Sequence, residues 1–149
     1  MTLIPRTRDE VRATIDAMSA EVRRNLSPGW LELLEKSSAL DPWVHGFHVT
    51  NDAGLVVGLG GFKGPPCDGT VEIAYAIVPE QQRKGHATEA ARALVSYAFT
   101  HAEVQVVRAH TMPDGVASQR VLQKSGFRQV GEVIDPEDGL VWRFELARS

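Results

Sequence analysis

Apolar positions near the start of the chain follow the spacing of a helix. The residues that share this face are Val11, Ile15, Met18 and Val22. Thr7 stands three residues before Glu10, the spacing of a capping box, so the pattern predicts one helix that begins after Thr7 and includes all four apolar positions. Ser27-Pro28 predicts a second, short helix ending near Ser37, because serine is a favourable N-cap and proline suits the first helical position.

After the second helix the pattern changes to period two. The positions on one face of this predicted strand are Trp43, His45, Phe47 and Val49. Turn residues separate it from two further predicted strands, at residues 55–62 and 70–77. The three segments predict an antiparallel meander, in which His45 is a buried pocket or core residue.

The second half of the chain predicts a strand–helix–strand crossover. One face of its long helix carries mostly small residues: Ala87, Ala90, Ala91, Leu94, Val95 and Ala98. A β-branched strand over residues 104–111 follows, so this strand and the one before the helix are expected to be parallel. A short helix over residues 116–125 ends at Gly126, and residues 127–134 and 140–146 predict a closing antiparallel pair.

Length and composition narrow the class of protein. The 149 residues suffice for one core, so residues 1–149 are predicted to form a single mixed α/β domain. A formal net charge of −3 disfavours nucleic-acid binding. The single Cys67 excludes an intramolecular disulfide and multi-cysteine metal sites, and the chain shows neither an export signal nor an apolar run of membrane length. A cytoplasmic protein without a metal is therefore expected.

Residues 77–88 carry the most informative chemistry. They lie between a predicted strand and the N-terminus of the long helix, where the first backbone N–H groups have no intrahelical acceptor. Gly85 lets a ligand approach the backbone closely, and Arg83 and Lys84 add positive charge, which predicts a site for a phosphorylated ligand. The glycine patterns of Walker A and dinucleotide-binding loops are absent, which disfavours nucleotide hydrolysis and hydride transfer.

Two motifs occur in order in this half of the chain. Residues 82–87 read Gln-x-x-Gly-x-Ala, and residues 109–127 lead from a strand into a short helix that ends in Gly126-Phe127. Together with the order of helices and strands, these motifs resemble the GNAT superfamily of acyl-CoA-dependent N-acetyltransferases. The second motif is similar to that of the branch that includes the acetyltransferases of ribosomal-protein N-termini.

The resemblance implies a fold and a coenzyme site. The fold is α/β, with a central, mostly antiparallel sheet of six to seven strands, one parallel pair that splays apart, and about four helices. Acetyl-CoA is the implied co-substrate, with the backbone of Ile77 and Val78 and the side chain of Ser118 beside its pantetheine arm. The other implied coenzyme residues are Gln82, Arg83, Lys84, Gly85, His86, Ala87 and Thr88, the amides from Arg83 to Thr88 holding the pyrophosphate. Gly115 stands where the family usually has asparagine, which removes one hydrogen bond to the coenzyme.

Acetyl transfer to an amine also needs a base, because an alkyl ammonium with a pKa of about 10 must lose a proton before attack. Glu72, on the strand over residues 70–77, is the base that the resemblance implies; the alternative is a solvated strand glutamate. His110 is a second candidate base or acceptor ligand, and its alternative is a hydrogen-bonded histidine at a strand end. Leu122 stands where many family members have a tyrosine that protonates the leaving thiolate; Tyr75 is another hydroxyl near the site in sequence.

These expectations combine into one predicted reaction. The chain is expected to transfer acetyl from acetyl-CoA to a primary amine, in a small molecule or at a protein N-terminus, by direct attack in a ternary complex. The alternative is a non-catalytic module that binds or senses acyl-CoA, which Gly115 and Leu122 favour. Trp30, Trp43 and Phe47 either line the acceptor cleft or pack in the core. Neither a nucleic acid nor a membrane is an expected partner, whereas a homodimer is.

Overall fold

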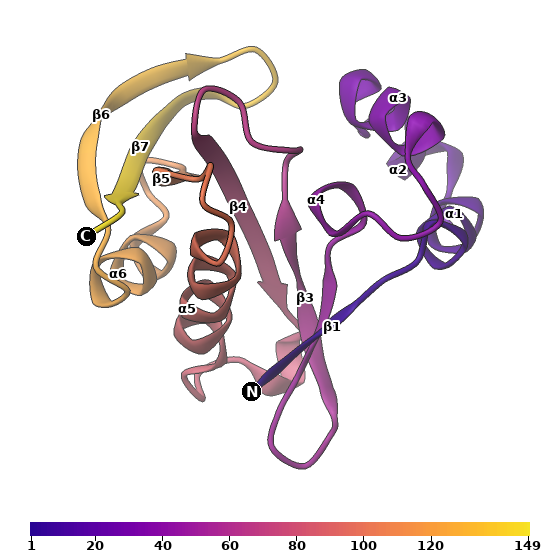
Figure 1. Cartoon of the computed structure of the whole chain (residues 1–149), viewed down its shortest axis with the longest axis horizontal. Helices are drawn as coiled ribbons and strands as arrows, with labels where there is room; N and C mark the ends of the chain where they lie inside the picture. The colour runs from indigo at the N-terminus through magenta and orange to yellow at the C-terminus, as the bar shows by residue number, and fades with distance from the viewer.

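A seven-stranded sheet organises the molecule (Figure 1), and the computed structural model describes residues 1–149. The strands are β1 (Thr2–Pro5), β2 (Phe47–Thr50), β3 (Val56–Phe62), β4 (Thr70–Ile77), β5 (Val106–Thr111), β6 (Arg128–Asp135) and β7 (Gly139–Ala147). Their order is β1-β2-β3-β4-β5-β7-β6, and only β4 and β5 are parallel. The predicted α/β class, with one parallel pair in a mostly antiparallel sheet, is confirmed.

The parallel strands pair only at their beginnings. Partnered residues run from Thr70 with Val106 to Glu72 with Arg108. Beyond that point β4 continues beside β3, whereas β5 continues beside β7 as far as Thr111. The two strands therefore diverge after Glu72 and leave a gap in the sheet at their C-terminal ends.

Helices α5 and α6 contact the sheet around this gap (Figure 1). The helices are α1 (Arg8–Asp16), α2 (Ala20–Arg24), α3 (Pro28–Lys36), α4 (Pro42–His45), α5 (His86–Phe99) and α6 (Val116–Lys124), with a 3-10 turn at Pro79–Gln81. Four of them, α1, α3, α5 and α6, have nine or more residues. The predicted small-residue face of α5 is buried at Ala90, Ala91, Leu94 and Ala98. Small side chains let the helix approach β3 and β4 closely.

The prediction of one long N-terminal helix is wrong. Thr7 caps α1 in a capping box as expected, but α1 ends at Asp16. Ser19 then caps the separate helix α2 by accepting from the Val22 N–H at 3.2 Å. Val22 is 49% exposed, so its helical spacing does not reflect burial.

The predicted strand over residues 43–49 is also wrong in its first half. Asp41 caps the short helix α4, and Gly46 (φ 71°) separates α4 from β2. β1, which was not predicted, pairs with β2 from Thr2 to Pro5. Four residues that include a proline show no clear alternation of apolar and polar side chains. Pairing with β2, rather than the pattern of residues 2–5, therefore determines this strand.

The N-terminal helices form a lobe beside the sheet (Figure 1). Val11, Leu34 and Val44 make its small core, separate from the main core under α5. His45 is 2% exposed, and its ring nitrogens contact the Ser37 hydroxyl at 2.9 Å and the Asp41 N–H at 3.0 Å, which confirms the predicted core histidine. Burial lowers the pKa of His45. No helix is both long and apolar enough to span a bilayer.

Candidate functional site

The N-terminus of α5 presents a row of unpaired backbone donors. None of the N–H groups from Arg83 through Thr88 donates to a protein acceptor, whereas the next one, of Glu89, donates to the Gly85 carbonyl at 3.2 Å. No side chain caps this end of the helix. Free N–H groups and the positive end of the helix dipole together favour an anion here.

Two residues of this loop adopt the left-handed conformation. Arg83 has φ 66° and Gly85 has φ 82°. Glycine adopts this conformation freely, whereas a residue with a side chain costs about 1 kcal/mol or more. A Cβ at Gly85 would meet no atom within 4 Å, so backbone conformation, not crowding within the chain, accounts for this glycine. The loop is folded as a backbone concavity suited to phosphate oxygens.

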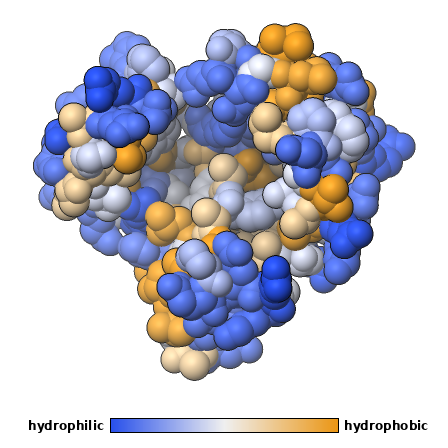
Figure 2. Space-filling model, turned by 180° about the vertical axis from the view of Figure 1, so that it is seen from behind, coloured by the Kyte–Doolittle hydropathy of each residue, from blue (hydrophilic) through white to orange (hydrophobic).

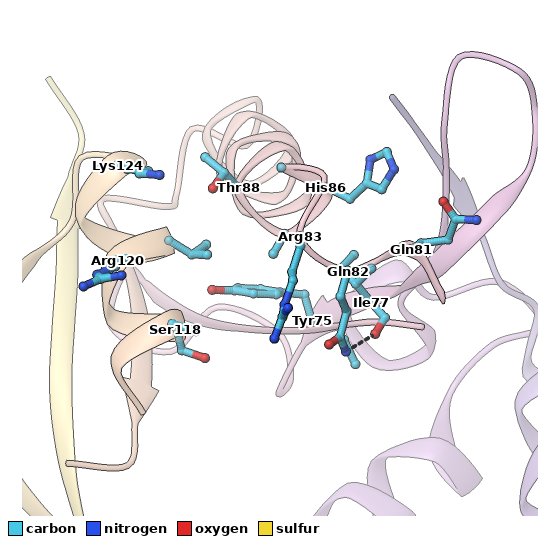
Figure 3. A pocket seen from close by; sticks show the side chains of 15 residues that line it. Tyr75, Ile77, Gln81, Gln82, Arg83, His86, Thr88, Ser118, Arg120 and Lys124 are labelled. Atoms are coloured by element: carbon cyan, nitrogen blue, oxygen red, sulfur yellow. Dashed lines mark hydrogen bonds between the residues drawn. The ribbon is translucent and has the colours of Figure 1, made fainter. Parts of the chain in front are cut away.

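A cavity of about 770 Å³ adjoins this loop, the end of β4 and helix α6 (Figure 3). Eight of the predicted coenzyme residues line it: Ile77, Gln82, Arg83, Gly85, His86, Ala87, Thr88 and Ser118. Arg120 and Lys124 line it from α6 and were not predicted. Arg120 and Lys124 follow Ala117 by three and seven residues, a helical spacing that was the available signal. The residues present suit a large ligand with several phosphate groups.

Val78 and Lys84 are not brought to this cavity. The Val78 N–H donates to the Val57 carbonyl in β3 at 2.9 Å, and the Lys84 ammonium lies 3.4 Å from the side-chain oxygen of Gln81. Val78 is 38% exposed. Lys84 still offers its free backbone N–H, but its side chain lies outside the cavity and can contribute only attraction of anions at longer range.

Strand alternation gives Tyr75 a backbone role that the motifs did not predict. Because Val78 turns its backbone toward β3, Tyr75 and Ile77 turn theirs toward the gap beside β5. The Ile77 carbonyl there accepts from the side-chain amide of Gln82 at 2.9 Å (Figure 3). Tyr75, rather than Val78, therefore offers backbone groups to an extended ligand.

A smaller cavity of about 150 Å³ lies where β4 and β5 diverge. Its polar lining residues are Lys63, Glu72, Tyr75, His110, Thr111 and Ser118. Tyr75 and Ser118 line both cavities, so the smaller cavity adjoins the larger one. Both predicted catalytic residues, Glu72 and His110, are thus brought together at one end of the predicted coenzyme site.

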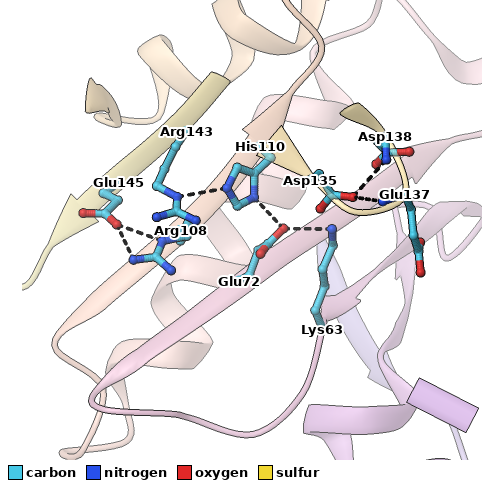
Figure 4. Close-up of polar contacts among 9 residues, drawn as sticks. All are labelled: Lys63, Glu72, Arg108, His110, Asp135, Glu137, Asp138, Arg143 and Glu145. Atoms are coloured by element: carbon cyan, nitrogen blue, oxygen red, sulfur yellow. Dashed lines mark hydrogen bonds and ion pairs between the residues drawn. The ribbon is translucent and has the colours of Figure 1, made fainter. Parts of the chain in front are cut away.

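Glu72 is held by two partners on the same oxygen (Figure 4). Its Oε2 accepts from the Lys63 ammonium at 2.8 Å and from His110 Nδ1 at 2.9 Å. The Glu72 side chain is 21% exposed, and its other oxygen, Oε1, has no protein partner. The carboxylate is therefore fixed in place and keeps one oxygen free to accept a proton.

Arg143 on β7 determines the tautomer of His110. Arg143 Nε donates to His110 Nε2 at 3.0 Å, so that ring nitrogen is the acceptor and the ring proton resides on Nδ1, directed at Glu72 (Figure 4). Both ring nitrogens of His110 are occupied. This geometry favours the hydrogen-bonded alternative for His110 over a base and leaves Glu72 as the group with a free acceptor.

The charge of Lys63 is stabilised by surrounding carboxylates. Partial burial acts against its ammonium, but the hydrogen bond to Glu72 and attraction to Glu72, Asp135 and Asp138 outweigh it, so the pKa of Lys63 is raised. Asp135 ends β6 and Asp138 lies on the turn that follows it, near Lys63 (Figure 4). The neighbourhood of Glu72 thus attracts cations.

Leu122, at the position where many family members have a tyrosine that protonates the thiolate, is buried with 1% exposure. Burial raises the pKa of Tyr75 to about 12, so its hydroxyl stays protonated at neutral pH. It is suited to donate a hydrogen bond rather than to lose its proton. Gly115 lies in a tight place, because a Cβ there would be only 3.1 Å from the Met112 carbonyl oxygen.

The remaining candidates fall outside the site. Phe47 is buried in the main core, and Trp43 packs edge-on against Phe62 with ring centroids 4.7 Å apart. Trp30 packs in the N-terminal lobe and donates its indole N–H to the Val44 carbonyl at 3.1 Å. Cys67 is exposed and free. No three His, Cys, Asp or Glu side chains cluster in a way that could hold a metal ion.

Comparison with known proteins agrees with this geometry. Residues 1–128 match the family described as "Acetyltransferase (GNAT) domain". The chain therefore belongs to the GNAT acetyltransferase family. It is 34% identical over 104 residues to the uncharacterized N-acetyltransferase YjdG of Bacillus subtilis, covering 67% of this chain and 60% of that protein. It is 37% identical over 62 residues to the uncharacterized N-acetyltransferase YnaD of the same organism, covering 42% and 36%.

Solved structures share the fold. A spermidine N-acetyltransferase SpeG chimera from Vibrio cholerae and hSSAT superposes with a TM-score of 0.73, at 20% identity over 99% of this chain and 96% of that one. The aminoglycoside acetyltransferase AAC(6')-Ib, in complex with coenzyme A and kanamycin, gives a TM-score of 0.71 at 20% identity, covering 99% and 94%. The relatives named here do not show that the chain belongs to the branch of acetyltransferases that act on ribosomal-protein N-termini.

Proposed function

We propose that the chain transfers the acetyl group of acetyl-CoA to a primary amine by direct attack in a ternary complex. One observation carries the proposal: an anion-binding loop and a carboxylate with a free oxygen lie at two adjoining cavities. The loop at the N-terminus of α5, with Arg83 and the α6 side chains Arg120 and Lys124, would hold the phosphates. The gap between β4 and β5 would receive the thioester end.

In this reaction Glu72 removes the proton from the acceptor. The ammonium of the amine gives a proton to Oε1 of Glu72, directly or through water, and the neutral amine attacks the thioester carbonyl carbon. The C–N bond forms, the C–S bond breaks, the attacking nitrogen gives its second proton to solvent, and coenzyme A leaves as a thiolate. A coenzyme thiol with a pKa of roughly 8.5 leaves readily near neutral pH, so the absence of a tyrosine at Leu122 does not prevent turnover. Tyr75 stabilises the departing sulfur as a hydrogen-bond donor.

The acceptor is proposed to be a small cationic amine. Glu72, Asp135 and Asp138 already attract the ammonium of Lys63, and the same charges would attract an amine substrate. Structural neighbours named for spermidine and for aminoglycosides support this class. A protein N-terminus, the acceptor of the branch that the second motif resembles, is the alternative.

Coenzyme binding and an amine panel test the proposal together. Acetyl-CoA is expected to raise the melting temperature of the chain, and thiol release beyond one equivalent per chain is expected only when a suitable amine is added. Diamines and polyamines, amino sugars, amino acids and short peptides with free N-termini would separate the acceptor classes. Glu72→Gln should keep the thermal shift and lose turnover.

Two outcomes would contradict the proposal. Thermal stabilisation without thiol release over the whole panel would indicate the non-catalytic acyl-CoA-binding module. If acetyl-CoA does not stabilise the chain, the proposed coenzyme site is wrong. Gly85→Glu, which places a carboxylate in the anion-binding loop, is the matched negative control for that measurement. The cytoplasmic location and the homodimer stay predictions. Cell fractionation would test the location, and light scattering would test the oligomeric state.

A further inference from the structure

Lys63 is an amine of the chain itself held at the acceptor site. The chain has four lysines, Lys36, Lys63, Lys84 and Lys124. Lys63 alone lines the smaller cavity, where its ammonium lies 2.8 Å from Oε2 of Glu72. It occupies the kind of position that an amine substrate needs, next to the carboxylate that would deprotonate it.

The surroundings of Lys63 also permit movement. Its side chain is 54% exposed, and Lys63 directly follows β3, where its N–H donates to the Glu72 carbonyl of β4. A four-carbon stem with rotatable bonds lets the ammonium move along the cavity without moving the backbone. Through the lining shared at Tyr75 and Ser118, the cavity continues toward the predicted coenzyme site.

We infer that Lys63 is a site of self-acetylation, modified by the acetyl-CoA bound to its own chain; this inference rests on the proposed function. The Lys63 ammonium passes one proton to the Glu72 carboxylate, and the neutral nitrogen attacks the thioester carbonyl carbon. The C–N bond forms and the C–S bond breaks. The second nitrogen proton goes to solvent, coenzyme A departs as thiolate, and Nζ-acetyl-lysine remains.

Acetylation would change the acceptor site. The amide of acetyl-lysine carries no charge, so Glu72, Asp135 and Asp138 would lose the cation that they now share. The His110 contact still holds Oε2 of Glu72. The site would thereby become more attractive to a cationic amine. Acetylation of Lys63 would then favour the transfer of acetyl groups to added amines at the same site.

Incubation with acetyl-CoA in the absence of any amine tests this inference. Peptide mass spectrometry should find one acetyl group on Lys63, and thiol release should stop at about one equivalent per chain. The rate per chain should not depend on protein concentration. Lys63→Arg, which keeps a cation at Glu72 but removes the nucleophile, should abolish this stoichiometric release, and Glu72→Gln should slow acetylation of Lys63 by at least tenfold.

Lys36 supplies the matched control within the same chain. Its ammonium lies 2.7 Å from Glu32 on α3, the same pairing outside both cavities. Lys63 acetylated no faster than Lys36, or at a rate that rises with protein concentration, would overturn the inference. If added amines are still turned over in that case, the proposed function stands without it; if acetyl-CoA does not stabilise the chain, both fail. Thermal shifts of Lys63→Arg and Glu72→Gln with acetyl-CoA show that the variants are folded.

Discussion

At the scale of residues, two cross-strand pairs on β5 and β7 have different roles. Arg108 lies opposite Glu145, and His110 lies opposite Arg143, two residues further along the same strands. The first pair is a closed ion pair with an N···O distance of 2.7 Å. The second continues through His110 to Glu72 and so connects β7 with the candidate base. Arg143 is a positioning residue, because it reaches Glu72 only through His110.

Arg143→Gln should therefore lower kcat by about tenfold, the equivalent of roughly 1.4 kcal/mol, with little effect on the KM for acetyl-CoA. Without the Arg143 donor, the His110 ring is no longer held with its Nδ1–H directed at Oε2 of Glu72. Steady-state kinetics with acetyl-CoA and a saturating amine separates the loss in kcat from any change in KM.

Arg108→Gln is the matched control for that variant. It breaks a charged pair on the same two strands without touching His110. An equal loss of kcat in Arg108→Gln would show that β5 and β7 respond only to lost charge. An unchanged kcat in Arg143→Gln would assign no positioning role to the Arg143 contact.

At the scale of elements, periodicity predicted the segments that bury a regular face. Helices α3, α5 and α6 and strand β4 lie close to the expected bounds, because their apolar residues alternate or repeat as the core requires. Strand β1 depends on pairing with β2, which is distant in sequence, whereas α2 and α4 begin at the local caps Ser19 and Asp41, which the apolar spacing obscured. The site divides in the same way. The α5 loop is contiguous and was recognisable, whereas Lys63 and Arg143 meet Glu72 and His110 only through strand register.

Helix α6 should contribute to coenzyme affinity through its charges. Arg120→Gln and Lys124→Gln are each expected to weaken acetyl-CoA binding about three- to tenfold, because each removes a cation that lines the larger cavity. The loss should shrink as salt concentration rises, since screening weakens the wild-type attraction as well. Calorimetric titration at two salt concentrations measures this.

A cation elsewhere on the surface serves as the comparison. Arg128→Gln, at the start of β6, removes the same formal charge outside both cavities. If Arg128→Gln weakens acetyl-CoA binding equally, the net charge of the chain, rather than the cations of α6 in the cavity, accounts for the effect. No weakening in either α6 variant would place the phosphates elsewhere along the α5 loop.

At the scale of the whole molecule, the divergence of β4 and β5 connects the two faces of the sheet. Helix-side residues of β5, Val107, Ala109 and Thr111, are buried, whereas Arg108 and His110 turn to the opposite face. That opposite face is hollowed at its centre (Figure 2). The smaller cavity takes lining from both sets, since Ala109 and His110 both border it. A coenzyme held by α5 and α6 and an amine arriving from the opposite face can therefore meet in the gap.

Tyr75 lies in this gap, and its burial links the site to the stability of the whole chain. The pKa of its hydroxyl is about 12 in the folded protein, against an ordinary value of 10.0, because burial disfavours the phenolate. As pH rises the unfolded chain loses this proton first, so the contribution to stability is complete below pH 10 and disappears between pH 10 and about 12. Its size is about 2–3 kcal/mol in the free energy of unfolding.

Tyr75→Phe should consequently flatten the alkaline decline of stability, because phenylalanine has no proton to lose. Urea unfolding measured at intervals from pH 8 to about 11 gives the slope for both proteins. Tyr97→Phe is the comparison, because burial also raises the pKa of Tyr97 but that ring lies away from the gap. Its slope should change less than that of Tyr75→Phe. Equal slopes in wild type and Tyr75→Phe would show that the Tyr75 hydroxyl reaches water in the folded chain and is free to ionise there.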